Sequence, residues 1–205
     1  MLGRLHVITD NRFGRDPRLA VPVALDGGAD VIQVRVKGWT DRRLLELTEQ
    51  VVAWCEQYGA ACIVNDRVDV ALASRAGGVH LGADDLPVSV ARRLLGSQAF
   101  VGGTARDAAT ARALVAAGAT YLGVGPCFAT VTKAGLPDPI GLAGVAAVAV
   151  AVDVPIIAIG GIRVGQIAEL RAAGAYGVAV VDAVSGADDQ AGAVRDLSRA
   201  LASIP

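Results

Sequence analysis

Short runs of apolar residues recur along the chain, and most of them follow a segment that ends in alanine and glycine. The runs are too short to be helices, and they lack the alternation of polar and apolar residues that is typical of a strand with one solvent-exposed face. This pattern is typical of parallel strands that are buried on both faces. Eight strands are predicted, beginning near Leu5, Val31, Ala61, Val79, Phe100, Tyr121, Ile156 and Val178.

The segments between the predicted strands have the marks of helices. The clearest is Thr40–Tyr58, where Thr40 can cap the first turn and apolar residues follow a spacing of three or four. Its apolar stripe consists of Leu44, Leu47, Val51 and Trp54. Another helix is predicted from Ala187 towards Ile204, and Pro87 suits the first turn of a third. Glycine is expected just after a last helical turn, because it enters the left-handed region without a Cβ clash. The glycines in such positions are Gly27–Gly28, Gly59, Gly77–Gly78, Gly118 and Gly174.

The alternation of strands and helices predicts an α/β fold. Eight strand–helix units in 205 residues match the short end of the range for a (β/α)8 TIM barrel, whose active sites lie at the C-terminal face of the strands. A doubly wound open sheet is the competing interpretation. No linker or low-complexity segment interrupts the alternation, so residues 1–205 are predicted to form a single barrel domain.

Composition and charge exclude several classes of protein. A net charge of −1 gives no basic excess for binding nucleic acid or an anionic membrane. The opening MLGRLHVITD lacks the pattern of a secretion signal, and the longest apolar stretch, Val145–Val152, is far too short for a membrane span. Three cysteines without CxxC spacing do not suggest a disulfide framework or a zinc site. We therefore expect a cytoplasmic protein with no nucleic-acid or membrane partner, and leave a homo-oligomer open.

The second predicted strand, Val31–Lys37, departs from the apolar pattern in a regular way. One face carries Ile32, Val34 and Val36, which can pack against helices. The other face carries Gln33, Arg35 and Lys37. Charge that points into a barrel is costly unless a ligand compensates it, so two cations and an amide in line predict an anion-binding wall. The alternative is an edge strand with a solvated face.

Carboxylates follow the third and fourth predicted strands. Asn65 and Asp66 end the third strand, and Asp85 comes shortly after the fourth. Adjacent parallel strands end on the same rim, so Asp66 and Asp85 are predicted to lie close together. Two close carboxylates repel each other unless a cation bridges them, and Mg²⁺ binds one or two carboxylates plus substrate phosphates. Each aspartate alone also suits a helix N-cap or first turn. Facing Arg35 and Lys37, the pair favours the metal.

Loops after the later strands offer donors to phosphate oxygens. Thr130, Thr132 and Lys133 bring two hydroxyls and an ammonium together after a Gly-Pro turn. Gly160–Gly161 and Val181–Asp182 follow the seventh and eighth strands, where barrels of this kind often bind phosphate. A tight turn is the simpler interpretation of the two glycines.

Two other residues invite a catalytic interpretation. Cys127 could be a nucleophile, but no obvious His/Asn partner accompanies it. His80, on a strand, is more simply an interior histidine whose hydrogen bonds are satisfied. No base–nucleophile pair is therefore expected.

Six stretches stand in order along the chain: HVITD, QVRVK, VNDRVDVALA, GVHLGADDLP, YLGVGPCFATVTK and PIIAIGGI. Taken together, they resemble the thiamine phosphate synthase family. The resemblance covers nearly the whole chain, and Asp66 and Asp85 stand as far apart as the family's two magnesium-binding aspartates. The family couples 4-amino-2-methyl-5-hydroxymethylpyrimidine diphosphate with 4-methyl-5-(2-phosphoethyl)thiazole and releases diphosphate and thiamine phosphate. The resemblance therefore implies a Mg²⁺-dependent transferase of thiamine biosynthesis.

The resemblance also implies roles for single residues. Those around the pyrimidine diphosphate would be Gln33, Arg35, Lys37, Asn65 and Thr104, the last where the family usually has serine. The Mg²⁺ ligands would be Asp66 and Asp85. Phosphate groups would be bound by Thr130, Thr132 and Lys133, with Lys133 reaching the diphosphate. The thiazole phosphate would be received by Gly161 and by the backbone at Val181 and Asp182. The implied catalytic residues are Arg35, Lys37 and Lys133.

Three positions depart from the family pattern. Ala83 stands where glutamine is frequent, Arg106 where histidine is frequent, and Asp182 where serine is frequent. A carboxylate at position 182 would repel a phosphate unless it turns away or is neutralised, for instance by Arg163. Two alternatives therefore stay open. A related thiazole tautomerase would need a histidine where Arg106 stands and would not need paired aspartates, and a non-catalytic barrel could bind a phosphorylated thiamine precursor.

Overall fold

The computed structural model describes residues 2–130, 132 and 135–203. Within these residues the strands form a closed parallel barrel in which each strand pairs with its neighbours in sequence and the last returns to the first. The strands are β1 (Leu5–Ile8), β2 (Val31–Val34), β3 (Ala61–Asn65), β4 (Gly78–Leu81), β5 (Phe100–Ala105), β6 (Tyr121–Val124), β7 (Ile156–Ile159) and β8 (Gly177–Val180). The closed order confirms the predicted (β/α)8 TIM barrel and excludes the open sheet.

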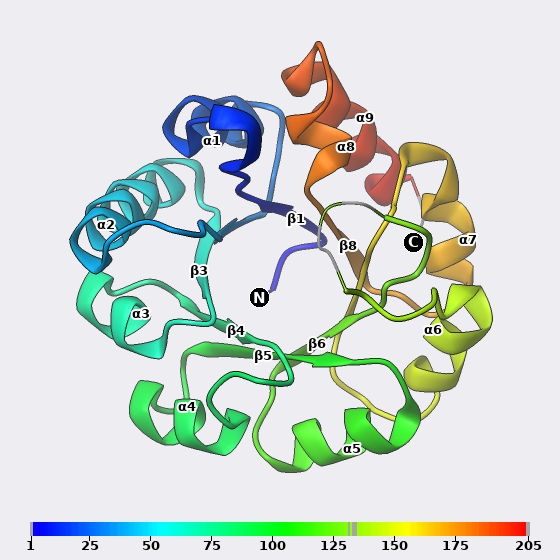
Figure 1. Cartoon of the computed structure of the whole chain (residues 1–205). Helices are drawn as coiled ribbons and strands as arrows, with labels where there is room; N and C mark the ends of the chain where they lie inside the picture. Colours follow the sequence, from blue (N-terminus) through cyan, green and yellow to red (C-terminus); the bar gives the residue numbers. More distant parts are fainter. Residues whose placement is uncertain (1, 131, 133–134, 204–205) are drawn as a thin grey trace.

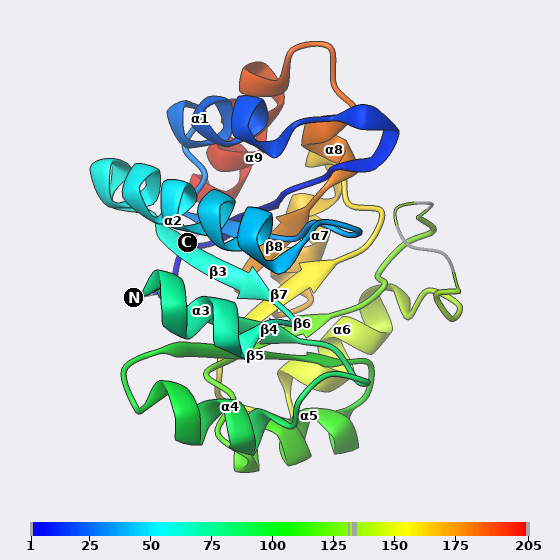
Figure 2. The same cartoon turned by 60° about the vertical axis from the view of Figure 1, so that its left-hand side comes forward.

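Helices surround this barrel as a ring (Figure 1) and cover its outer face (Figure 2). They are α1 (Pro17–Asp26), α2 (Asp41–Tyr58), α3 (Val68–Ser74), α4 (Val88–Leu95), α5 (Ala108–Ala116), α6 (Gly141–Ala149), α7 (Ile167–Ala172), α8 (Asp182–Ser185) and α9 (Gln190–Ala202). Short 3₁₀ turns, η1 (Arg12–Gly14) and η2 (Val164–Gln166), precede α1 and α7. In the described part of the chain, no helix combines the length and the apolar character that crossing a membrane requires.

Side chains of each strand point alternately to two separate apolar cores. Ile32 and Val34 of β2 pack in a cluster with helix residues such as Leu47. Their neighbour Val31 belongs to a smaller cluster inside the barrel. The buried members of that inner cluster are Leu2, Ile8, Val31, Ile63, Tyr121, Ile157 and Ala179. Burial of the strands on both faces, predicted from their continuous apolar runs, is confirmed in β8, where all four residues are buried. In β2 all four residues are buried as well, although one of them is Gln33.

Two helix ends show where the glycine rule applies and where it does not. Thr40 caps α2, accepting a hydrogen bond from the N–H of Arg43 at 3.4 Å, and Gly59 ends the helix with a left-handed φ of 67°. At the end of α3 the prediction of a terminal glycine at Gly77 is wrong. Arg75 takes the left-handed conformation there, with a φ of 56°. The helix therefore ends before the glycines are reached.

Two helix starts are fixed by residues just before them. Helix α9 begins at Gln190 rather than at Ala187, because the Asp189 side chain accepts a hydrogen bond from the N–H of Gly192 at 2.8 Å and caps the helix there. Pro87 lies at the N-cap of α4, immediately before the first turn.

The predicted strand through Lys37 is too long, because β2 ends at Val34. Beyond that point two side chains from the neighbouring segment replace regular strand pairing. The hydroxyl of Thr9 accepts from the N–H of Arg35 at 2.8 Å and donates to its carbonyl at 2.9 Å. The amide of Asn11 bonds the backbone of Lys37 in the same way, at 3.1 and 2.8 Å. These bonds fix the backbone of both cations at the rim.

Two glycines leave room for rings inside the barrel. A Cβ at Gly102 would lie closer than 3.0 Å to the ring atoms of Tyr121 and His80, and one at Gly123 would meet His80 equally closely. Strands β5 and β6 thus accommodate the His80 ring in the interior.

Candidate active site

A cavity of about 610 Å³ opens where the strands end, and the predicted site residues line it. Those found in its lining are Gln33, Arg35, Lys37, Asn65, Asp66, Asp85, Thr104, Thr130, Thr132, Gly161, Val181 and Asp182. Lys133, the remaining predicted residue, lies outside the described residues. The structure therefore brings together every predicted site residue that it describes.

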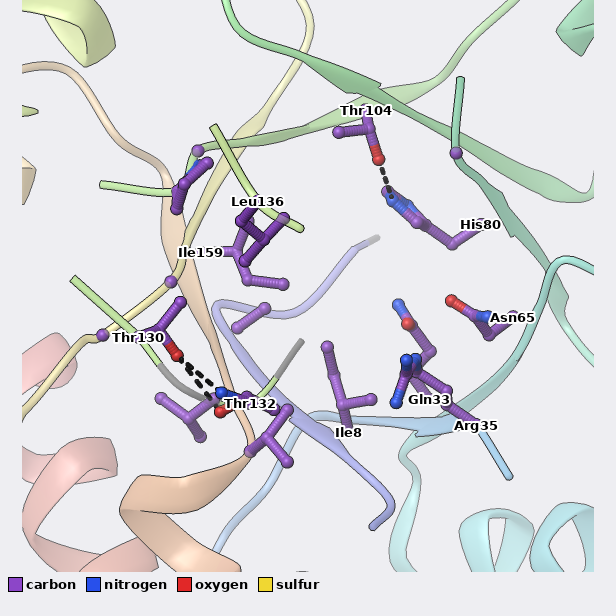
Figure 3. Close-up of a pocket in the computed structure, with 18 of the residues that line it drawn as sticks. Ile8, Gln33, Arg35, Asn65, His80, Thr104, Thr130, Thr132, Leu136 and Ile159 are labelled. Carbon is purple, nitrogen blue, oxygen red and sulfur yellow. Dashed lines mark hydrogen bonds between the residues drawn. The ribbon is translucent and has the colours of Figure 1, made fainter. Parts of the chain in front are cut away.

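The cavity has two polar sides. Figure 3 shows Gln33, Arg35 and Asn65 gathered on one side and Thr130 with Thr132 on the other, with Ile8 between them in this view. The apolar side chains of Ile8, Ile159 and Leu136 also line the space. Such a lining suits a ligand with an apolar middle and charged groups at its ends.

Asp66 and Asp85 meet at the ends of β3 and β4, as their positions predict. The Nζ atom of Lys37 lies 2.7 Å from Oδ2 of Asp66, and the carboxyl groups of Asp66 and Asp85 contact each other. Burial alone would raise the pKa of Asp66, but the bonds from Asp85 and Lys37 outweigh it and hold the pKa below its ordinary value. Burial, and then the neighbouring Asp66, raise the pKa of Asp85. One carboxyl of the pair thus resists ionisation beside the other, a conflict that a bound cation relieves.

Neither aspartate caps a helix, so the alternative interpretation of the pair is wrong. Helix α3 starts after Arg67 and helix α4 after Pro87, and neither N-cap makes a side-chain cap bond. Asp66 has a left-handed φ of 66°, which is uncommon outside glycine. Oδ2 of Asp85 accepts a hydrogen bond from the N–H of Gly82 at 2.6 Å. Backbone geometry and this bond hold both carboxyl groups at the rim.

His80 is an interior histidine with satisfied hydrogen bonds, as expected, and it also lines the cavity. Its Nδ1 lies 3.1 Å from the hydroxyl oxygen of Tyr121, and its Nε2 lies 3.0 Å from Oγ1 of Thr104 (Figure 3). Burial lowers the pKa of His80 to about 4, so the ring is neutral near pH 7. In the tautomer in which Nδ1 accepts the Tyr121 proton, Nε2 donates to Thr104, whose own hydroxyl can then donate to a ligand. The contact with Thr104 could not be inferred from strand periodicity.

The segment after β6 packs tightly against the end of β7. Oγ1 of Thr130 lies 3.1 Å from Oγ1 of Thr132 and accepts a bond from the Thr132 N–H at 3.3 Å. A Cβ at Gly161, whose φ is 67°, would come closer than 3.0 Å to the carbonyl oxygen of Ala129. Gly161 is therefore required by chain packing, and its suggested part in phosphate binding stays a prediction.

Asp182 is neutralised where the sequence predicts a conflict with phosphate. Its Oδ2 lies 3.5 Å from a guanidinium nitrogen of Arg163, and its Oδ1 lies 3.8 Å from one of Arg12. The contact with Arg163 agrees with the expectation from sequence. Arg12 was not predicted, because nothing in a linear pattern places residue 12 beside residue 182.

Arg106 and Cys127 offer no alternative chemistry in the cavity. A guanidinium nitrogen of Arg106 donates to the backbone carbonyl of Asp138, and neither Arg106 nor Cys127 is among the lining residues. Burial raises the pKa of the Cys127 thiol to about 11, so the thiol stays protonated near pH 7. It donates to the carbonyl of Val124 at 3.3 Å.

Comparison with known proteins gives a consistent result. The family described as thiamine monophosphate synthase matches residues 5–184. A thiamine-phosphate synthase of Salinispora tropica is 56% identical over 203 residues, covering 98% of each chain. One from Chloroflexus aurantiacus is 47% identical over 203 residues, 98% of this chain and 93% of the relative. A solved thiamine phosphate pyrophosphorylase from Pyrococcus furiosus has a TM-score of 0.89 at 36% identity and covers 98% of this chain and 96% of its own.

Proposed function

The chain belongs to the thiamine monophosphate synthase family, and on that basis we propose that it is the transferase that makes thiamine phosphate. It joins 4-amino-2-methyl-5-hydroxymethylpyrimidine diphosphate to 4-methyl-5-(2-phosphoethyl)thiazole and releases diphosphate. The observation that carries the proposal is the shared cavity, in which the cations after β2 face the acid pair of β3 and β4. The cytoplasm is our proposed location, which the free state of all three cysteines supports.

Charge in the cavity supports a requirement for a divalent cation. The described lining carries three cations, Arg35, Lys37 and Arg163. It carries four carboxyl groups, those of Asp66, Asp84, Asp85 and Asp182. Even with Lys133 counted among the cations, the bases do not outnumber the acids, so the side chains alone provide no surplus of positive charge for a diphosphate.

Asp66 and Asp85 fit Mg²⁺ as that charge. Both offer oxygen ligands, and their carboxyl groups are in contact. Among the described residues, no group of three or more His, Cys, Asp or Glu could hold a metal ion. Mg²⁺ needs only one or two carboxylates, because water and substrate phosphates complete its coordination. When bound, Mg²⁺ would neutralise charge on the diphosphate.

The reaction needs charge stabilisation more than a protein nucleophile. The bond between the pyrimidinylmethyl carbon and the diphosphate oxygen breaks, and the oxygen keeps the electron pair. The lone pair of the thiazole nitrogen then forms the new bond to that carbon. Arg35 and Lys37 stabilise the leaving diphosphate, with Lys133 as a third cation, while Gln33 and Asn65 hold the pyrimidine side. Thr104, bonded to the neutral His80, donates towards the pyrimidine.

The second substrate occupies the opposite side of the cavity. Thr130 and Thr132 offer hydroxyl donors there, and Gly161, Val181 and Asp182 line the end at which the thiazole phosphate is received. Transfer requires both substrates in one space, with the thiazole nitrogen positioned against the reacting carbon.

Purified protein given both substrates with Mg²⁺ should form thiamine phosphate, measured by chromatography. Asp66→Ala and Asp85→Ala should each abolish this formation while circular dichroism shows an intact fold, because the cation loses a ligand. Asp196→Ala, at an exposed carboxyl on α9, is the matched control and should keep full activity. Absence of product from the unaltered protein would reject the proposed activity. Undiminished turnover in excess chelator would reject only the metal.

A further inference from the structure

Arg163 stands at the rim of the cavity on a fixed backbone. The N–H of Arg163 donates to the side-chain oxygen of Gln166 at 2.8 Å, and the preceding Ile162 is only 4% exposed. The Arg163 side chain, by contrast, is 65% exposed, and the residue lines the cavity next to Gly160–Gly161. A long cationic side chain is thus anchored at its base and able to move at its tip.

Arg12, the other arginine beside Asp182, makes its shorter bonds to Asp10. It makes two bonds to the carboxylate of Asp10, from Nε at 2.8 Å and from an Nη at 3.0 Å, and donates to the carbonyl of Thr132 at 3.2 Å. Arg15 also bonds Asp10, at 2.6 Å. The Asp10 side chain is 1% exposed, so these bonds are shielded from water.

Charge in this cluster does not cancel. Three guanidiniums, those of Arg12, Arg15 and Arg163, lie against only two carboxylates, those of Asp10 and Asp182, so one positive charge is in excess. Arg12 and Arg15 both bond the buried Asp10. The remaining positive charge is that of Arg163, whose contact with Asp182 is 3.5 Å long. An exposed ion pair at this distance is weak and exchanges readily with another anion.

Taking the proposed function as its basis, we propose that Arg163 binds the phosphate of the thiazole substrate. In the resting protein its guanidinium lies against Asp182, and on binding it turns to the phosphate, which offers shorter, charge-assisted and bidentate bonds. Arg12 stays 3.8 Å from Asp182, so one positive charge remains beside that carboxylate while the phosphate dianion is bound. The chain can therefore carry an acid where serine is frequent in the family without repelling its second substrate.

Steady-state kinetics with each substrate varied in turn tests this role. Arg163→Ala should raise KM for the thiazole phosphate about 10- to 100-fold and leave KM for the pyrimidine diphosphate within about twofold. Arg163→Lys should recover part of the loss, because the charge returns without the bidentate geometry. Arg199→Ala is the matched control, since Arg199 is also exposed and lies 3.6 Å from an aspartate, and it should change neither KM.

Two kinetic results would overturn the inference: an unchanged KM for the thiazole phosphate in Arg163→Ala, or a rise in the KM for the diphosphate substrate instead. Failure of the proposed function is distinguishable, because it appears in the unaltered protein as absence of product. In that case calorimetric titration with the thiazole phosphate still decides the matter. Tighter binding to the unaltered protein than to Arg163→Ala supports the role, and equal or undetectable binding rejects it.

Discussion

Replacing Asp10 with asparagine removes one negative charge and leaves the shape of the side chain nearly unchanged. The Asp10 carboxylate is buried and accepts bonds from Arg12, from Arg15 and from the hydroxyl of Ser185, the last at 3.2 Å. Loss of the charge removes the buried anion to which both guanidiniums bond, although Arg12 still lies 3.8 Å from Asp182. The Arg12 and Arg15 side chains are 26% and 32% exposed, so water can solvate them in part and the cost stays below that of a fully buried unpaired ion.

The size of the effect follows from the pKa of Asp10. Burial alone would raise it, but the bonds from Arg12 and Arg15 lower it from 3.8 to about 2. At about 1.36 kcal/mol for each pKa unit, the ionised carboxylate contributes about 2 kcal/mol to the free energy of unfolding. Because the folded-state pKa lies below the ordinary value, this contribution is present above about pH 4 and is lost as the pH falls towards about 2.

Urea unfolding measured for both proteins between pH 7 and pH 3 checks this expectation. Asp10→Asn should be less stable by about 2 kcal/mol at pH 7, and the difference should narrow below about pH 4. The control Asp196→Asn, at an exposed carboxyl 3.6 Å from Arg199, should change stability by less than about 0.5 kcal/mol. Equal stability of Asp10→Asn and the unaltered protein at pH 7, or a difference that does not narrow between pH 4 and pH 3, would refute the reasoning.

Three further substitutions have clear expected outcomes. Gly102→Ala places a Cβ closer than 3.0 Å to the Tyr121 ring and should lower the free energy of unfolding by about 1–3 kcal/mol, measured by thermal unfolding. The control Gly165→Ala meets nothing within 4 Å and should leave stability unchanged. Similar losses of stability in both variants would contradict the packing argument. Cys127→Ser should keep kcat within about twofold, because a thiol held protonated by burial is not the nucleophile, and a collapse of kcat would reverse that conclusion. Lys133→Ala should raise KM for the pyrimidine diphosphate about tenfold in steady-state assays, and an unchanged kcat/KM would count against its role.

The barrel is readable from sequence because its strands are buried on both faces. Continuous apolar runs such as Gly177–Val180 have few alternative explanations when they recur with helical segments between them. The boundaries are less readable, since they depend on local bonds. Arg75 ends α3 in a conformation usually taken by glycine, and the side chains of Thr9 and Asn11 take over from the backbone where β2 stops.

Contacts within the site can be predicted from the sequence only where the order of the strands in the barrel determines them. Asp66 and Asp85 are predictable neighbours because adjacent strands end on one rim. The cluster around Asp182 is different, because its two arginines come from β1–α1 and β7–α7 connections whose side chains could take many directions. The bond between His80 and Thr104 likewise depends on the register of β4 on β5 and on space left by glycine. No periodicity encodes such contacts.

Closure of the barrel through β1 and β8 has a consequence for synthesis of the protein. Strand β1 is synthesised first and β8 last. One hydrogen-bonding edge of β1 therefore stays unpaired until Gly177–Val180 has left the ribosome. An open edge is a template for pairing with another chain. Nascent or truncated chains that lack β8 should therefore be far more prone to aggregation than the complete protein, even when most of the helices are in place.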